Sequence, residues 1–311
     1  MQVMQALTVC GLLMPGAVGC GRGGLFASRA FHQRCGWRAE EYFADPLVIA
    51  LCRAIEAKDL AEMERLVKDG ADINARGKDG MTPLLWAFPD NQLPRFKWLL
   101  EHGANPNVPV DGGFHTRQMI SRGDSVTYMV CKTSFPGYFD AVFDNGGDPN
   151  LKHTGPVGFS YRPLFTVISS GVPEKKEKVR RLIALGADMD ALALGVTPLG
   201  LAVAWGGQCD IALVMLHAGA NFRTYGEDQI QRLIHWVARQ ERRLPEYTDR
   251  QRADFDELVK WLEDHGESYA KAKADLDRWD SWSGQQFRQK MDAEIAERKA
   301  REKTAAGQER D

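Results

Sequence analysis

The chain has 311 residues, 44% of them hydrophobic, and a formal net charge of −2 at pH 7. This length allows one or two ordinary domains with a buried core. The near-neutral charge excludes a generally basic surface that could hold a phosphate backbone, so we expect no nucleic-acid partner.

The first 24 residues differ in composition from the rest of the chain. Ala6–Val18 carries no charged residue. Such a run is too short to cross a hydrocarbon core of about 30 Å as a helix, but it suits the core of a signal peptide. The sequence AVGC at Ala17–Cys20 resembles a bacterial lipobox, in which the cysteine is lipidated and becomes the mature N-terminus.

We therefore expect residues 1–19 to be a lipoprotein signal peptide and Cys20 to be the lipidated residue. A lipid at this cysteine would anchor the protein to a membrane of the bacterial cell envelope, facing the periplasm. The alternative is a soluble, cytoplasmic protein with an apolar N-terminal segment.

Residues 20–45 are expected to form a linker and a cap on the first repeat. Cys35 lies in this segment, and Cys52 lies 17 positions further on, in an apolar helical stretch. In an oxidising compartment a disulfide between them could contribute on the order of 3 kcal/mol. The alternative is a pair of free thiols, with Cys52 as a small core residue.

One short pattern recurs along the next part of the chain. It consists of Gly, then Ala or Gly, then Asp or Asn, and its copies are Gly70–Asn74, Gly103–Asn107, Gly146–Asn150, Gly186–Asp190 and Gly219–Arg223. Glycine before Asp or Asn suits left-handed backbone and side-chain-capped turns. The first and the last interval between these glycines are both 33 residues, which predicts a unit of that length with insertions.

Helical patterns flank each turn. Before the turn, apolar residues recur at i, i+3 and i+4, as in FKWLLEHG. After it, Met81–Ala87, Tyr161–Ile168 and Val196–Ala204 each place Pro at the first helical position, and two of them have Thr as the cap. Each unit therefore reads as turn, helix, loop and helix.

These motifs resemble the ankyrin repeat family, whose unit begins with a TPLHxA-like helix and ends in a Gly-Ala-Asp/Asn turn. The resemblance covers residues 46–266. It implies an all-α fold, an ankyrin-repeat solenoid of stacked helix pairs with β-hairpin-like loops. The family's His after TPL is Leu85, Phe165 or Gly200 here, and the unit around residues 108–140 has no TPL.

The resemblance also implies a partner surface, made by the ends of the first helices and by the hairpin loops. Trp86 and Trp205 lie at first-helix ends, where they either pack against the adjacent repeat or bind a partner. The loops at residues 108–116 and 151–160 are long, and they are either recognition loops or tolerated insertions. The candidate contacts are Trp86, Trp205, Lys78, Asp79, Phe114, Phe159 and Tyr161.

Residues 267–311 follow the last unit, which is expected to act as a cap with a polar outer face. The apolar residues of this segment have near-helical spacing and are Trp279, Trp282, Phe287, Met291 and Ile295. They predict one long amphipathic helix, docked on the repeats or on a partner, and a charged tail.

Motifs for chemistry are missing from the sequence. It contains no CxxC, HExxH, GxSxG or GxxxxGK[ST], so we expect no catalytic residue, metal, cofactor or small-molecule substrate. The leading hypothesis is a non-catalytic, protein-binding scaffold held at a bacterial membrane. The alternatives are an immunity or regulatory lipoprotein that neutralises an envelope-acting effector enzyme, and an enzyme whose residues assemble only in the fold.

Overall fold

The computed structural model describes residues 32, 35–112, 120–154, 160–193, 195–204, 207–223, 231–281 and 285–308. The predicted signal segment and Cys20 lie outside these residues. The chain divides into two compact units. The first comprises residues up to 104 together with 110–121, and the second comprises 105–109 together with the residues from 122 onward.

The first unit consists of short helices that pack in sequence order. They are α3 (Ala39–Tyr42), α4 (Pro46–Ala57), α5 (Leu60–Lys68), the 3-10 helix η1 (Lys78–Gly80), α6 (Pro83–Ala87) and α7 (Leu93–Glu101). Helix α4 packs against α5 and α6, and α6 packs against α7. The side chains of Asp45, Asp59 and Thr82 cap α4, α5 and α6 by accepting backbone N–H groups of the first turn.

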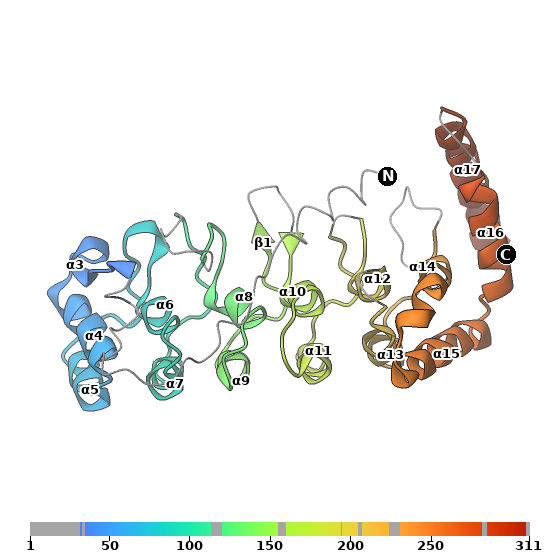
Figure 1. The fold of residues 1–311 in the computed structure, drawn as a ribbon. Helices are drawn as coiled ribbons and strands as arrows, with labels where there is room; N and C mark the ends of the chain where they lie inside the picture. The colour runs from blue at the N-terminus through green and yellow to red at the C-terminus, as the bar shows by residue number, and fades with distance from the viewer. Residues whose placement is uncertain are drawn as a thin grey trace. The chain divides into compact units, whose positions relative to one another are not determined.

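The second unit repeats this arrangement. Its elements are α8 (Val126–Val130), α9 (Tyr138–Asp144), β1 (His153–Thr154), β2 (Ser160–Tyr161), α10 (Pro163–Ser169), α11 (Lys175–Ala184), α12 (Pro198–Ala204), α13 (Cys209–His217), α14 (Leu233–Gln240), η2 (Glu241–Glu246), α15 (Asp249–Asp264), α16 (Tyr269–Asp280) and α17 (Gln285–Gln308). Figure 1 shows α8, α10, α12 and α14 in one layer of this unit and α9, α11, α13 and α15 in the other. The predicted alternation of turn, helix, loop and helix is confirmed.

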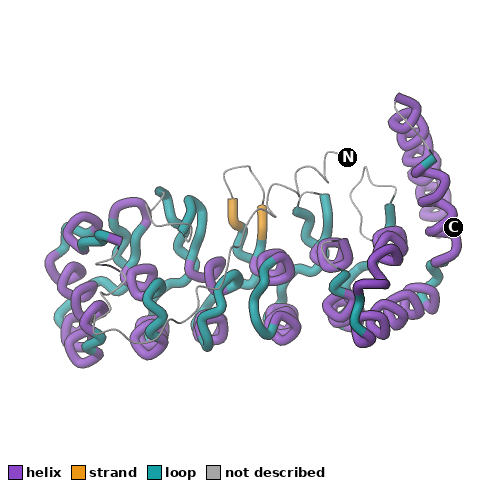
Figure 2. Tube along the Cα trace, in the orientation of Figure 1, coloured by secondary structure: helices purple, strands orange, loops and turns teal. Residues whose placement is uncertain are grey.

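Strands β1 and β2 form a small antiparallel hairpin in which His153 faces Tyr161 across the ladder. In Figure 2 this hairpin projects from the layer that contains α10. It is the described part of one long loop that the sequence predicted to be hairpin-like.

The recurring turn has a common hydrogen-bond pattern. Each turn glycine has a positive φ, between 83° and 102°, which only glycine adopts at no steric cost. The third residue of every turn accepts, through its side chain, the backbone N–H of the fifth. These bonds join Asp72 to Asn74, Asn105 to Asn107, Asp148 to Asn150, Asp188 to Asp190 and Asn221 to Arg223, at 2.7–3.1 Å.

The fifth residue of the turn bonds to the following turn. Asn150 Nδ2 donates to the Gly186 carbonyl at 2.8 Å, and Asn150 Oδ1 accepts from the Asp188 N–H at 2.8 Å. Asn107 makes the same pair of bonds to Gly146 and Asp148. The asparagines therefore recur because their side chains bond one turn to the next. The period of the sequence motif is the spacing between these bonded turns.

The repeat without a TPL motif forms its first helix with a different cap. Ser125 takes the place of the capping Thr, and its Oγ accepts the Tyr128 N–H at 3.1 Å. Val126 stands where α6, α10 and α12 have Pro, and α8 begins there. This repeat keeps the helix of the predicted unit although the usual motif is absent.

The N-terminal segment packs on the first repeats of its unit. Trp37 and Phe43 are buried, and α3 packs against α4 and η1. Cys35 and Cys52 are both free thiols, with Cys52 fully buried. The two thiols are not joined in this structure, and a disulfide between them in an oxidising compartment stays a prediction.

The C-terminal segment differs from the single long helix that the sequence predicted. Helix α16 ends at Asp280 and α17 begins at Gln285. Trp279 is buried on α16, and its Nε1 donates to Glu294 Oε2 of α17 at 3.1 Å. Met291 and Ile295 are half-buried on α17, whereas Trp282 and the Phe287 side chain lie outside the described part. No helix among the described residues is long and apolar enough to cross a membrane.

Candidate functional site

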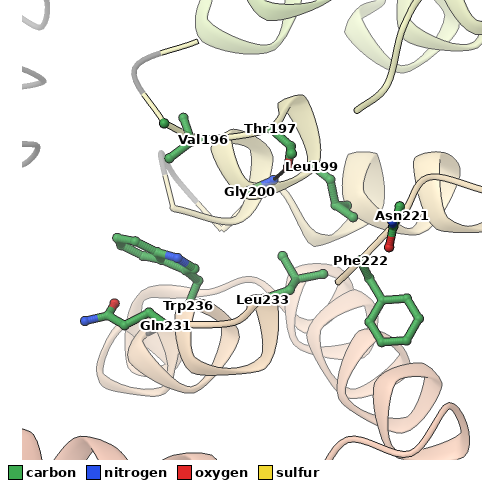
Figure 3. A pocket seen from close by; sticks show the side chains of 10 residues that line it. Val196, Thr197, Leu199, Gly200, Asn221, Phe222, Gln231, Leu233 and Trp236 are labelled. Carbon is green, nitrogen blue, oxygen red and sulfur yellow. Dashed lines mark hydrogen bonds between the residues drawn. The ribbon is translucent and has the colours of Figure 1, made fainter. Parts of the chain in front are cut away.

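A small pocket, partly open to solvent, lies in the second unit beside the first turns of α12 and α14 (Figure 3). Three separate segments of consecutive repeats build it. Its lining residues are Gly195, Val196, Thr197, Leu199, Gly200, Asn221, Phe222, Gln231, Leu233 and Trp236. None of these side chains carries a charge.

Apolar side chains form part of the pocket walls, beside the polar groups of Thr197, Asn221 and Gln231. Val196, Leu199 and Leu233 are buried, and Phe222 and Trp236 are partly exposed. In Figure 3 the indole of Trp236 lies on the side of α14, with Val196 and Gly200 on the opposite side. The pocket therefore offers aromatic and aliphatic surface to whatever enters it.

Gly200 lies on the α12 side of the pocket. Its N–H donates to Thr197 Oγ1 at 3.1 Å, as part of the helix cap. The corresponding residues of other repeats, three positions after the cap, are Leu85, Tyr128 and Phe165. A Cβ built on Gly200 would have as its nearest neighbours Thr197 Oγ1 at 3.5 Å and Val196 Cβ at 3.9 Å, which are ordinary contact distances.

The structure therefore does not require glycine at position 200, although glycine in a helix costs about 1 kcal/mol relative to alanine. Its effect is to leave open a space that a side chain fills in the other repeats.

Gln231 supplies a polar atom to the pocket. Its Oε1 is buried and has no hydrogen-bond partner among the described residues. A buried acceptor without a donor costs about 1–3 kcal/mol. An incoming N–H or O–H group would offset that cost.

Trp86, one of the predicted partner contacts, is fully buried in the first unit. Its ring centroid lies 4.7 Å from that of His32, 5.5 Å from that of Trp37 and 5.8 Å from that of Tyr42. Its Nε1 donates to Glu56 Oε1 at 3.2 Å. The prediction that Trp86 contacts a partner directly is wrong, because the N-terminal segment covers this ring.

Burial in this aromatic cluster also changes two pKa values. Burial lowers the pKa of His32 from 6.5 to about 4, although its hydrogen bond with the Trp86 carbonyl opposes the shift. Burial raises the pKa of Glu56, partly opposed by the hydrogen bond from Trp86.

The other predicted contacts belong to different parts of the chain. In the first unit, Lys78 is exposed in η1 and Asp79 is half-buried with φ of 58°. In the second unit, Tyr161 is half-buried on β2, with its ring edge-on to Phe165. Trp205, Phe114 and Phe159 lie outside the described residues. Among the predicted contacts that the structure describes, none lines the pocket. The sequence feature that belongs to the pocket is Gly200, which follows TPL where the ankyrin family has His.

A second polar group of the same unit is buried away from the pocket. Asp124 exposes 1% of its surface, and Lys132 Nζ donates to its two carboxylate oxygens at 3.0 and 3.1 Å. His153 Nε2 lies 3.2 Å from Asp124 Oδ1, and the His153 ring stacks on Tyr128 at 4.2 Å. These contacts join the β1–β2 hairpin to α8. No group of His, Cys, Asp and Glu in the described ranges could hold a metal ion.

Comparisons with known proteins agree with this architecture. Residues 79–110 match the family model described as ankyrin repeat. The ankyrin repeat domain of Bcl-3, a member of the IκB protein family, is similar, with a TM-score of 0.50 and 21% identity over 72% of this chain and 87% of that chain. An ankyrin repeat domain from Acinetobacter baumannii AYE has a TM-score of 0.51 and 21% identity over 67% and 94%. No curated protein matches in sequence. At this identity the likeness establishes the fold, and it confirms the predicted all-α solenoid.

Proposed function

Because the chain has the ankyrin-repeat fold, we propose that it is a non-catalytic scaffold that binds another protein. Solenoids of this kind present an extended face whose residues come from successive repeats. The observation that carries the proposal is the neutral pocket, with aromatic and aliphatic side chains in its lining, that α12 and α14 present on one face of the second unit.

The chemistry of the pocket supports binding rather than reaction. Hydrolytic and transfer reactions need a nucleophile or an acid and base pair within reach of the substrate. The hydroxyl in the lining belongs to Thr197, and it already accepts the Gly200 N–H as a helix cap. Aromatic and aliphatic side chains beside neutral polar groups can provide an anchoring contact for a protein partner.

We further propose that the scaffold is held at the bacterial cell envelope by a lipid on Cys20. The support comes from the sequence, in which an uncharged apolar run precedes AVGC. Two or more acyl chains anchor a protein stably where a single chain does not. Replacing Cys20 by Ser should therefore move the protein from the membrane fraction to the soluble fraction, and unchanged fractionation would reject this part of the proposal.

Affinity capture from detergent-solubilised membranes, read out by mass spectrometry, tests the scaffold proposal. The tagged full chain should retain a specific protein that an unrelated tagged solenoid does not retain. If that protein is an effector enzyme whose activity falls on binding, the scaffold has the neutralising role. If repeated captures from the envelope and from the soluble fraction retain nothing above the control, the scaffold proposal fails.

A further inference from the structure

We propose that the pocket beside Gly200 receives one neutral, apolar side chain of the partner protein, together with a hydrogen-bond donor that pairs with Gln231 Oε1. This inference rests on the proposed function, because it assumes that the partner is a protein. It adds where the anchoring contact lies and what chemistry the partner must present there.

The first argument is the space at position 200. A Cβ at this position would meet nothing closer than 3.5 Å, so the protein could carry alanine there. Alanine would also strengthen the helix by about 1 kcal/mol. Glycine at this position is therefore unfavourable for α12 itself and favourable only for whatever occupies the space.

The second argument is the pattern of polarity around that space. The ten lining residues that the structure describes are all neutral, so a charged side chain would lose its hydration without gaining an opposite charge from them. Gln231 Oε1 is buried and accepts no hydrogen bond within the described part of the second unit. A backbone N–H beside the inserted side chain would satisfy it, and an apolar side chain flanked by peptide groups is what a protein segment supplies.

The third argument is the composition of the rim. Phe222 and Trp236 are only partly exposed, and they line the pocket together with buried Leu199 and Leu233. Aromatic side chains of this kind bury large areas on binding at a small entropy cost. Leu, Ile, Met and Phe are thus the side chains that we expect in the pocket.

A random peptide library displayed on phage and selected on the immobilised full chain tests this inference. The selected peptides should share one of these four residues, and synthetic copies should bind with an affinity that isothermal titration can measure. Replacing Gly200 by Leu fills the pocket and should weaken binding at least tenfold. Replacing Gln231 by Ala removes the acceptor and should weaken binding by about threefold to tenfold.

Two variants serve as controls. Gly171 belongs to the same unit but does not line the pocket, and a Cβ there would meet nothing within 4 Å. Gly171→Leu should therefore bind the peptides like the wild type. Gly200→Ala adds one methyl group at ordinary contact distances, so it should melt at or above the wild-type temperature while binding about threefold more weakly. This variant decides the question if Gly200→Leu does not fold.

The outcomes separate the pocket from the scaffold proposal. Peptides whose affinity is the same for wild type and Gly200→Leu would overturn the pocket while leaving protein binding intact. A selection that enriches charged peptides, or none at all, would also overturn the pocket. The membrane capture decides the scaffold proposal independently, because it does not depend on where the partner docks.

Discussion

Replacing Trp86 by Ala tests whether this tryptophan belongs to the core of the first unit. The ring is fully buried, and the side chains of His32, Trp37 and Tyr42 lie around it. The substitution removes these ring contacts and the hydrogen bond to Glu56. It leaves a cavity that the short helix α6 cannot close by itself.

The magnitude follows from the burial. Truncating a buried Trp or Phe to Ala costs about 3–5 kcal/mol, a range that already includes the loss of ring contacts. The bond to half-buried Glu56 adds little, because that carboxylate regains water. We expect a loss of about 4 kcal/mol, which at about 2–4 °C per kcal/mol corresponds to a fall of about 8–16 °C in Tm if the repeats unfold together.

Thermal unfolding followed by far-UV circular dichroism measures this change. Trp98 is a matched control in the same unit, because it is only half-buried and stacks on His102 at the end of α7. Trp98→Ala should lower the unfolding free energy by about 1 kcal/mol or less. Trp86→Phe keeps a ring among His32, Trp37 and Tyr42. Its loss of unfolding free energy should lie between those of Trp86→Ala and Trp98→Ala.

The refuting result is specific. If Trp86→Ala melts within the error of the wild type and loses the captured partner, Trp86 is a surface contact and the reasoning from burial is wrong. If instead it melts early while the protein that stays folded binds normally, the tryptophan is structural.

Three further predictions concern stability. Asn150→Ala removes both bonds to the next turn, so urea unfolding should show a loss of about 1–2 kcal/mol; Asp190→Ala, which loses only the acceptor for the Asn221 N–H, should cost less. Asp124→Ala leaves buried His153 and partly exposed Lys132 without their carboxylate. We expect about 2–3 kcal/mol of destabilisation, below the range for fully buried pairs because Lys132 keeps part of its hydration. A variant as stable as the wild type would show that the contacts of Asp124 do not hold the β1–β2 hairpin. The pKa of His32 is about 4 in the folded protein and 6.5 in the reference state. Because the unfolded chain binds more protons between these values, the unfolding free energy should fall by up to about 3 kcal/mol as pH drops from 6.5 to 4. His32→Phe should remove this part of the pH dependence in urea titrations, and an identical pH dependence in both proteins would contradict the burial of His32.

The sequence by itself determined the repeat, because its signals are local. A glycine that must adopt positive φ and an Asx residue that caps its own turn are needed within five consecutive residues, so they recur wherever the turn recurs. The same holds for the cap and Pro at the start of α6, where Thr82 satisfies a backbone N–H three residues away. Such signals survive in one dimension, and the helix pairs could be predicted from them.

The burial of a side chain by a segment distant in sequence could not be predicted from such local signals. Trp86 at a first-helix end has the same sequence environment whether it is covered or open. Only the return of the N-terminal segment, with His32 more than fifty positions away, decided that it is covered. The break between α16 and α17 was missed for a similar reason, since apolar spacing alone does not show where Trp279 turns inward.

The candidate pocket depends most on tertiary structure. In the sequence, Gly200 is a departure from the TPLH motif, and Gln231 belongs to no motif. They face the same space only because α12 and α14 pack side by side, with Asn221 and Phe222 of the intervening turn between them. The residues around a glycine or a buried amide oxygen decide whether it can take part in binding. In a solenoid those residues come from the neighbouring repeat.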